Sequence, residues 1–288
     1  MNAVTAQGLD LDEVRSLVAT ALAEDLKYGP DVTTNATVPA GAVATASVVS
    51  RQFGTIAGLD VGLVVLDEVL GAGNYDIVDR VVDGARVEPG TSVLTVTGPI
   101  RGLLTAERTM LNLLCHLSGI ATATAAWVAE VSDTDTKIRD SRKTLPGLRA
   151  LQKYAVRAGG GVNHRMGLGD AALIKDNHVA AAGSVVAALR AVRAAAPSIE
   201  CEVEVDSLEQ LDEILAEDVE LVLLDNFPLW QTQMAVQRRA KLAPSTRLES
   251  SGGLTLDVAH DYAKTGVDFL AVGGLTHSVT VLDLGLDM

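Results

Sequence analysis

Residues 201–226, with the sequence CEVEVDSLEQLDEILAEDVELVLLDN, decide the fold of this 288-residue chain. The apolar runs at 201–205 and 221–224 predict two strands, and the amphipathic stretch 207–216 between them predicts a helix. A strand, a helix and a strand at this spacing form a unit whose strands lie parallel. The segment therefore predicts an α/β protein with a parallel sheet.

The same alternation continues on both sides of this segment. It predicts further strands at 137–140, 171–175, 246–249 and 269–272, and further helices at 146–157, 184–196, 229–241 and 256–265. Six strand–helix units are fewer than the eight of a closed (β/α) barrel. We expect an irregular, incomplete parallel α/β barrel over residues 117–277, and an open doubly wound sheet is the alternative.

The first 116 residues show a different pattern of predicted helices and strands. Asp10 and Glu13, at capping-box spacing, predict the start of a helix over 10–26, and a second helix is expected at 61–70 between strands at 44–50 and 91–96. The uncharged stretch 109–129 contains several polar residues, which favours a buried interior helix over a membrane span. We expect a separate N-terminal α/β domain over residues 1–116, with the tail 278–288 packing back on it.

Composition excludes several classes of function. The chain has 23 Lys and Arg against 37 Asp and Glu, a net charge of −14, and aromatic residues make up only 3% of it. This argues against a nucleic-acid-binding protein, which needs a basic surface and stacking side chains. Cys115 and Cys201 lie in apolar stretches and are expected to be reduced thiols, and acidic residues interrupt the N-terminal stretch where a signal peptide needs its apolar run, so we expect a cytoplasmic protein.

The residues that follow the predicted strands point to an active site, because the carboxyl ends of parallel strands meet at one edge. Asp and Gly are also common turn residues, so no single position is decisive, but the whole set is chemically coherent. It comprises Ser141, Arg142, Lys143, Lys175, Glu204, Asp225, Asn226, Ser250, Ser251, Gly252, Gly253, Gly273 and Gly274.

A concentration of positive charge accompanies this set. Residues 137–175 contain nine Lys or Arg and two acids, a local charge of +7 in an acidic protein, which indicates an anionic small-molecule ligand. Arg149, Lys153 and Arg157, spaced four residues apart, are expected to form a solvated helix face. The pair His164 and Arg165 suits carboxylates, and the glycine-rich loops suit phosphates.

Long motifs in this order closely resemble the quinolinate phosphoribosyltransferase family. They are GLLTAERTMLNLL (102–114), HLSGIAT (116–122), RDSRKTLPGLR (139–149), KYAVRAGGGVNHRMGLGD (153–170), LIKDNH (173–178), EVEVDS (202–207), LLDNF (223–227) and ESSGG (249–253). The likeness extends from about residue 25 to the C-terminus. One departure is Ser141, where the family more often has Thr and where a hydroxyl is still present.

The resemblance implies an N-terminal α/β open-faced sandwich and a C-terminal irregular α/β barrel. It also implies an enzyme, a glycosyltransferase of NAD biosynthesis, that makes nicotinate mononucleotide, pyrophosphate and CO2 from quinolinate and phosphoribosyl pyrophosphate. Magnesium is expected and an organic cofactor is not. A homodimer or a dimer-based hexamer with shared active sites is expected.

The resemblance also implies roles for individual residues. A quinolinate clamp is expected from Arg142, His164, Arg165 and Lys175, with Arg108 coming from the neighbouring subunit. The phosphoribosyl pyrophosphate and metal side is expected from Lys143, Glu204, Asp225, Ser251, Gly252, Gly273 and His277, with Ser141, Gly253, Val272 and Gly274 as further substrate contacts. Lys143, Lys175, Glu204 and Asp225 are the expected catalytic residues, and Glu204 and Asp225 the expected magnesium ligands, directly or through water.

Two alternatives remain at this stage. A related phosphoribosyltransferase could use nicotinate without decarboxylation, although a clamp of five cationic residues exceeds the need of one carboxylate. A non-catalytic binding protein for a phosphorylated metabolite is the alternative from a different class, and release of pyrophosphate separates it from an enzyme.

Overall fold

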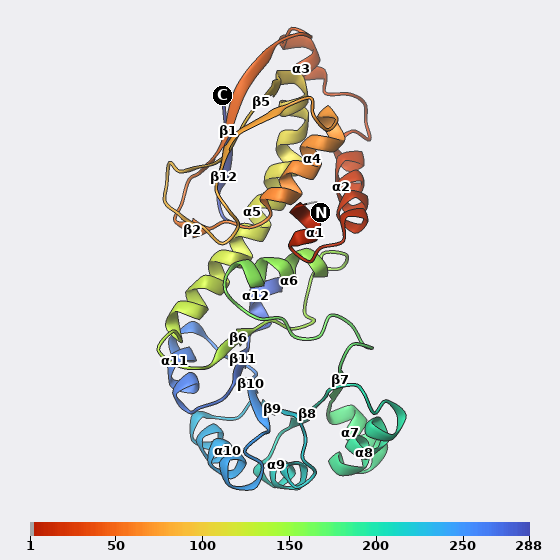
Figure 1. Ribbon diagram of the computed structural model, residues 1–288, viewed down its shortest axis with the longest axis vertical. Coiled ribbons are helices and arrows are strands. Elements are labelled where there is room, and N and C mark those ends of the chain that lie inside the picture. The colour runs from red at the N-terminus through yellow and green to blue at the C-terminus, as the bar shows by residue number, and fades with distance from the viewer. Residues whose placement is uncertain (1–2) are drawn as a thin grey trace. The chain divides into compact units, whose positions relative to one another are not determined.

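The computed structural model describes residues 3–288 and shows two α/β units, each drawn in Figure 1. The first unit contains the chain through Ala125 together with Thr144–Gly160 and Thr276–Met288, and the second contains Ala126–Lys143 and Gly161–Leu275. The chain therefore passes between the units more than once, and the segment that carries helix α6 (Arg149–Ala158) belongs to the first unit.

The first unit is built on a four-stranded antiparallel sheet in the order β12-β1-β5-β3. Its strands are β1 (Val43–Ser50), β3 (Asp76–Arg80), β5 (Ser92–Pro99) and β12 (Leu284–Asp287), and β2 (Gly54–Thr55) pairs separately with β4 (Arg86–Val87). The C-terminal strand β12 lies antiparallel to β1, with Ser50 opposite Leu284. The tail is thus an edge strand of the N-terminal sheet.

Helices cover one side of this sheet (Figure 1). They are α1 (Ala3–Ala6), α2 (Leu11–Asp25), α3 (Val32–Thr37), α4 (Leu59–Leu70) and the N-terminal part of α5 (Ile100–Glu130). Asp10 caps α2 by accepting from the backbone N–H groups of Asp12 and Glu13. Helices α4 and α5 approach closely, since a Cβ on Gly62 would lie 3.3 Å from Leu114.

Helix α5 is the one helix among residues 3–288 that alone has the length and hydropathy of a membrane span. The pair α7 (Asp176–Ala182) and α8 (Val185–Ala195) also passes if counted as a single span, despite a bend of 89° between them. Half of the apolar window of α5 is buried in the protein, including Leu114, Leu117 and Ile120, as the core helix of a folded domain would be.

The second unit holds a six-stranded parallel sheet in the order β6-β11-β10-β9-β8-β7. The strands are β6 (Lys137–Arg139), β7 (Ala172–Ile174), β8 (Cys201–Val205), β9 (Leu221–Asp225), β10 (Arg247–Ser251) and β11 (Phe269–Ala271). From β7 to β11 each strand lies beside its successor in the chain, and β6 then pairs with β11. This cyclic order is that of a barrel and differs from a doubly wound sheet, in which the strand order reverses.

The barrel is incomplete, because β6 and β7 do not pair within the described residues. A parallel bridge between Arg139 and Val162 extends the free side of β6 by a single residue. The helices of this unit are α7, α8, α9 (Leu208–Leu215), α10 (Leu229–Leu242) and α11 (Leu256–Lys264). The short α12 (Gly274–His277) begins in this unit and ends in the first. The expected α/β class, with a separate N-terminal part and an irregular parallel barrel, is confirmed, and the sheet of the N-terminal part is antiparallel.

One sequence-based expectation is wrong. Lys153 was expected on a solvated face of α6 but is fully buried, and it has a bonded partner. Helix α6 packs inside the first unit, where the Gln152 amide contacts the His116 ring at 2.8 Å and Arg157 donates to the Gln7 carbonyl at 2.8 Å. Four-residue spacing places side chains on one helix face, but only tertiary packing decides whether that face meets water.

Candidate active site

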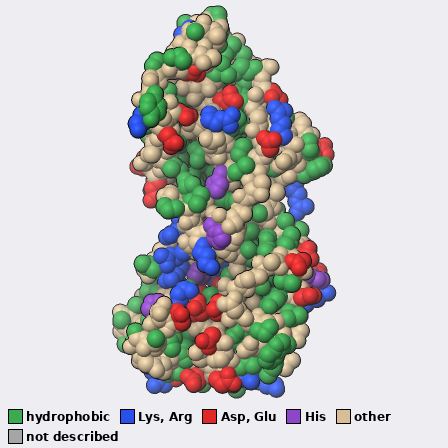
Figure 2. Space-filling view, turned by 180° about the vertical axis from the view of Figure 1, so that it is seen from behind, with side chains coloured by type: hydrophobic (Ala, Val, Ile, Leu, Met, Phe, Trp, Pro, Cys, Tyr) green, Lys and Arg blue, Asp and Glu red, His purple; other side chains and the backbone are tan. Residues whose placement is uncertain are grey.

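A cavity of about 530 Å³ lies in the second unit at the carboxyl ends of its strands. Its volume is in the range of small-molecule sites. Thirteen of the predicted site residues line it: Ser141, Arg142, Lys143, His164, Arg165, Lys175, Glu204, Asp225, Asn226, Ser251, Gly252, Gly253 and Gly273. Side chains of Lys and Arg adjoin those of Asp and Glu in the lower half of Figure 2.

Strand register explains why these residues meet. Successive side chains of a strand point to opposite faces, so Glu204 on β8 and Asp225 on β9 share the inner face with Ser251 on β10. Glu204 lies opposite Leu223, and Ser251 lies opposite Asp225. Carboxylates and a hydroxyl from three adjacent strands therefore converge at one end of the sheet.

Two neighbouring arginines bring positive charge into the cavity. The Nε atoms of Arg142 and Arg165 are both buried and have no hydrogen-bond partner among the described residues. Burial, and then the nearby Arg142 guanidinium, lower the pKa of Arg165. Arg165 is anchored by its Nη1, which donates to the Ala171 carbonyl at 2.9 Å. Two neighbouring guanidinium groups repel each other and leave donors unused, and an anion with several oxygen atoms would relieve both costs.

The lysines of the site lie at the ends of β6 and β7. Lys175 Nζ donates to Glu204 Oε2 at 2.5 Å, which joins a cation and a carboxylate at the cavity wall. Lys143 follows β6 in a turn in which its backbone N–H donates to Ser141 Oγ at 3.1 Å. The site thus carries both signs of charge within one cavity.

The loop after β10 has a backbone that requires glycine. Gly252 has φ +99°, and a Cβ there would collide with the Asn226 side chain. Asn226 itself adopts φ +54° and donates its backbone N–H to the Ser251 carbonyl at 2.8 Å. Gly253 also has a positive φ, and α11 begins at Leu256, so the loop brings exposed backbone to the start of a helix, an arrangement suited to phosphate.

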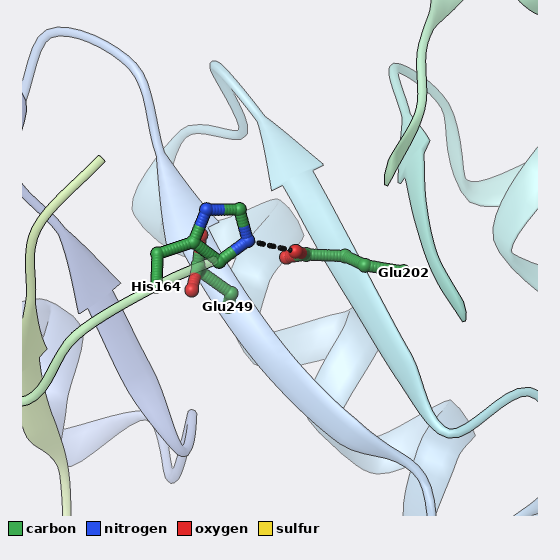
Figure 3. A group of neighbouring side chains, drawn as sticks. All are labelled: His164, Glu202 and Glu249. Carbon is green, nitrogen blue, oxygen red and sulfur yellow. Dashed lines mark hydrogen bonds and ion pairs between the residues drawn. The ribbon is translucent and has the colours of Figure 1, made fainter. Parts of the chain in front are cut away.

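His164, Glu202 and Glu249 form a buried cluster next to the cavity (Figure 3), and His164 and Glu249 line the cavity itself. His164 Nε2 is 2.5 Å from Glu202 Oε2, and Arg139 Nη1 donates to Glu249 Oε2 at 2.8 Å. Burial raises the pKa of Glu202 to about 7 and that of Glu249 to about 7. Asp140, fully buried, accepts from the backbone N–H of His164 at 2.8 Å.

Five of the predicted site residues are not among those lining the cavity. Ser250 is buried in β10. Val272 is buried and donates its N–H to the Arg139 carbonyl, and Gly274 begins α12. Arg108, exposed on α5, and His277, whose Nδ1 contacts Ser278 Oγ at 2.6 Å, belong to the first unit.

The sequence analysis did not predict the buried charged residues next to the cavity. Arg139, Asp140, Glu202 and Glu249 stand within or at the end of predicted strands and were not named as site residues. A signal was present: Glu202 and Glu204 alternate in an otherwise apolar strand, which places two carboxylates on one buried face.

Comparison with known proteins points to one family over nearly the whole chain. The model of the quinolinate phosphoribosyl transferase N-terminal domain matches residues 31–118, and that of the C-terminal domain matches residues 120–287. A nicotinate-nucleotide pyrophosphorylase [carboxylating] of Mycobacterium leprae is 68% identical over 97% of this chain and 98% of its own length. A probable enzyme of the same name from Bacillus subtilis is 42% identical over 84% of this chain and 83% of its own length.

Solved structures give the same assignment. The crystal structure of NadC from Streptococcus pyogenes superposes with a TM-score of 0.91 at 38% identity and covers 97% of each chain. The nicotinate-nucleotide pyrophosphorylase from Francisella tularensis superposes with a TM-score of 0.91 at 37% identity, again over 97% of each chain. With both domain models matched in order and the fold shared over nearly the full length, this chain belongs to the quinolinate phosphoribosyl transferase family.

Proposed function

We propose that this enzyme transfers the phosphoribosyl group of phosphoribosyl pyrophosphate to the ring nitrogen of quinolinate with loss of CO2. The products are nicotinate mononucleotide and pyrophosphate, and the reaction belongs to de novo NAD biosynthesis. The observation that carries the proposal is the pair of neighbouring guanidinium groups, Arg142 and Arg165, whose buried Nε donors have no partner in the part of the chain that the structure describes. Quinolinate, with carboxylates on adjacent ring carbons, offers oxygen acceptors to both.

The quinolinate side of the site uses the cationic wall of the cavity. Arg142, His164, Arg165 and Lys175 line it together, and a guanidinium grips a carboxylate through parallel hydrogen bonds. Arg108, as in the expectation from the family, would complete the clamp from a neighbouring subunit. This assignment requires a homo-oligomer, a dimer or a dimer-based hexamer.

The rest of the cavity would bind phosphoribosyl pyrophosphate. Lys143 and the backbone of the Ser251–Gly253 and Gly273 loops would hold phosphate oxygens, with His277 and Gly274 as further contacts. When pyrophosphate leaves, positive charge develops on the ribose carbon and negative charge on the leaving group. Glu204 and Asp225 would stabilise the first, and Lys143 the second.

Loss of CO2 needs no covalent nucleophile. Once the ring nitrogen carries ribose it is cationic, so the electrons left by CO2 on the adjacent carbon are stabilised by that charge. The protein has to hold the ring and its second carboxylate in place, and positioning of this kind supplies much of the rate.

Two carboxylates of the cavity are donors of the kind that magnesium prefers, and a magnesium ion would share Glu204 with Lys175, which donates to its Oε2 at 2.5 Å. Glu204 and Asp225 are hard oxygen donors on adjacent strands, and magnesium is usually bound by one or two carboxylates together with substrate phosphates. Bound there, the ion would neutralise pyrophosphate charge. The protein is further proposed to act in the cytoplasm on small molecules, without a nucleic-acid or membrane partner.

A product assay tests this function. The purified enzyme with quinolinate, phosphoribosyl pyrophosphate and magnesium should release pyrophosphate and CO2 in equal amounts and form nicotinate mononucleotide. The Lys143→Ala variant should lower both product signals together. Ligand binding without release of pyrophosphate would identify a binding protein, and pyrophosphate without CO2 would identify a phosphoribosyltransferase that does not decarboxylate.

A further inference from the structure

His164 is fixed at two points. Its backbone N–H donates to Asp140 Oδ1 at 2.8 Å, and its ring Nε2 lies 2.5 Å from Glu202 Oε2 (Figure 3). Asp140 is held in turn, because its Oδ2 accepts from Asn163 Nδ2 at 2.5 Å. The imidazole therefore has a set position and a set orientation within the cavity wall.

The Glu202 carboxylate is buried close to several cationic side chains of the site. It is only 3% exposed, and its Oε1 has no hydrogen-bond partner among residues 3–288. Arg139, Arg165 and Lys175 are close enough to interact with it electrostatically. A buried carboxylate oxygen without a hydrogen bond is costly, so the general stability of the fold gives no reason for an acid at this position.

A metal ion is one explanation of the cluster, since donor atoms of His164, Glu202 and Glu249 lie within 4.8 Å of one another. The contacts argue against it. Arg139 already donates to Glu249 at 2.8 Å, and its guanidinium would repel a divalent cation bound there. The same contacts are consistent with Glu202 orienting the His164 imidazole through their hydrogen bond.

We propose that Glu202 is a positioning residue that acts through His164 to set the affinity for the quinolinate carboxylates. The inference rests on the proposed function. With Glu202 accepting the Nε2–H hydrogen bond, the second ring nitrogen, Nδ1, lies on the side of the ring turned away from Glu202 (Figure 3). Fixing the ring in this orientation is what Glu202 contributes to the binding of a substrate carboxylate.

The chain provides a matched comparison for this idea. Glu249 lies in the same buried cluster and is also almost inaccessible, but its hydrogen bond is to Arg139 and not to His164. The substitutions Glu202→Gln and Glu249→Gln each remove one buried carboxylate and conserve side-chain volume. Only the first removes the carboxylate that is hydrogen-bonded to the imidazole, whereas Glu249 interacts with His164 electrostatically.

The experiment is steady-state kinetics with the two variants and wild type. Glu202→Gln should raise the KM for quinolinate at least about tenfold, because the hydrogen bond that orients the imidazole is weakened. It should leave the KM for phosphoribosyl pyrophosphate within about twofold of wild type. Glu249→Gln should raise the quinolinate KM by less than about threefold. Equal changes in both variants, or equal changes in both KM values, would overturn the proposal.

A double-mutant cycle tests whether Glu202 works through His164. Glu202→Gln added to His164→Ala should raise the quinolinate KM by less than about twofold, whereas a full tenfold further rise would refute the mechanism. If Glu202→Gln does not fold, Nε2 of His164 can be observed by ¹⁵N NMR in the wild-type enzyme. It should carry a proton, and an Nε2 without a proton would contradict the proposal.

Two further outcomes are separable. A metal ion bound to wild type in equal proportion to protein and lost in Glu202→Gln would replace the positioning role with a metal site. Failure of wild type to consume quinolinate would remove the proposed function itself, which is a different result from normal wild-type turnover with an unchanged Glu202→Gln variant.

Discussion

Replacing Arg165 by Gln should weaken catalysis without weakening the fold. Arg165 lies beside Arg142, both with buried Nε donors that lack partners among the described residues, so each arginine raises the electrostatic cost of the other. In the proposed complex Arg165 pairs with a quinolinate carboxylate, and truncating one partner of such a desolvated pair of opposite charges costs about 2 to 5 kcal/mol. Because Arg165 is only partly buried, the lower part of that range applies, about 2 to 3 kcal/mol, or a roughly 30- to 150-fold loss in kcat/KM for quinolinate.

The assay is steady-state kinetics combined with thermal unfolding. The melting temperature of Arg165→Gln should equal or exceed that of wild type, because one of two like charges has been removed. Arg165→Lys should fall between the two enzymes in kcat/KM, since it keeps the charge but loses the planar donor that reaches the Ala171 carbonyl. Arg190→Gln is the control, because Arg190 lies in an exposed ion pair with Glu217 and its loss should change kcat/KM by less than about twofold.

The reasoning would be refuted by the opposite combination. A melting temperature that falls by several degrees with kcat/KM near that of wild type would mean that Arg165 stabilises the fold and that no substrate anion relieves the repulsion from Arg142.

Three further predictions concern other parts of the enzyme. Lys143→Ala should lower kcat by roughly 10² to 10³ with a near-normal quinolinate KM in steady-state kinetics, since one preorganised contact to the leaving group is lost; a raised quinolinate KM with normal kcat would remove Lys143 from that role. A mixture of Arg108→Ala and Lys143→Ala proteins should regain activity on subunit exchange, because mixed dimers contain one intact site, and no recovery with exchange verified would place Arg108 outside the neighbour's site. Glu249 holds its proton more tightly in the folded chain, with its pKa raised by burial from 4.5 to about 7, so its stabilising effect is complete below pH 4.5 and is lost as pH rises through 7. In denaturant unfolding, raising the pH from 5 to 8 should increase the free energy of unfolding of Glu249→Gln relative to that of wild type by about 2 kcal/mol. A difference between the two proteins that does not change with pH would contradict the burial argument.

The sequence predicts the parallel part of the fold to within a few residues. The run at 201–205 is strand β8 without change, and that at 221–224 is β9 with the addition of Asp225. Alternating strands and helices are a local pattern that dictates parallel pairing, and parallel pairing dictates where the strand ends meet. For this reason Lys175, Glu204 and Asp225 line the cavity as expected.

Features decided by tertiary packing could not be predicted in the same way. Lys153 has the sequence spacing of an exposed lysine, but α6 packs inside the first unit and buries it. Helix α7 was missed because its seven residues are too few to show a helical period, and none of them is buried. Arg108 carries no local signal of function, and only the resemblance to the family brings it into the proposed site. His277 follows the glycine-rich segment after the last predicted strand, which is a local signal but not one that assigns a role.

The central claim, a cavity built for a molecule with two carboxylates, is tested most directly by the ratio of kcat/KM for quinolinate to that for nicotinate. Nicotinate has one carboxylate and would leave cations of the site unpaired, at a cost of several kcal/mol. We predict a preference for quinolinate of at least about 10³-fold, since each 1.4 kcal/mol is roughly tenfold. Comparable turnover of the two acids would contradict the carboxylate clamp formed by Arg142, His164 and Arg165.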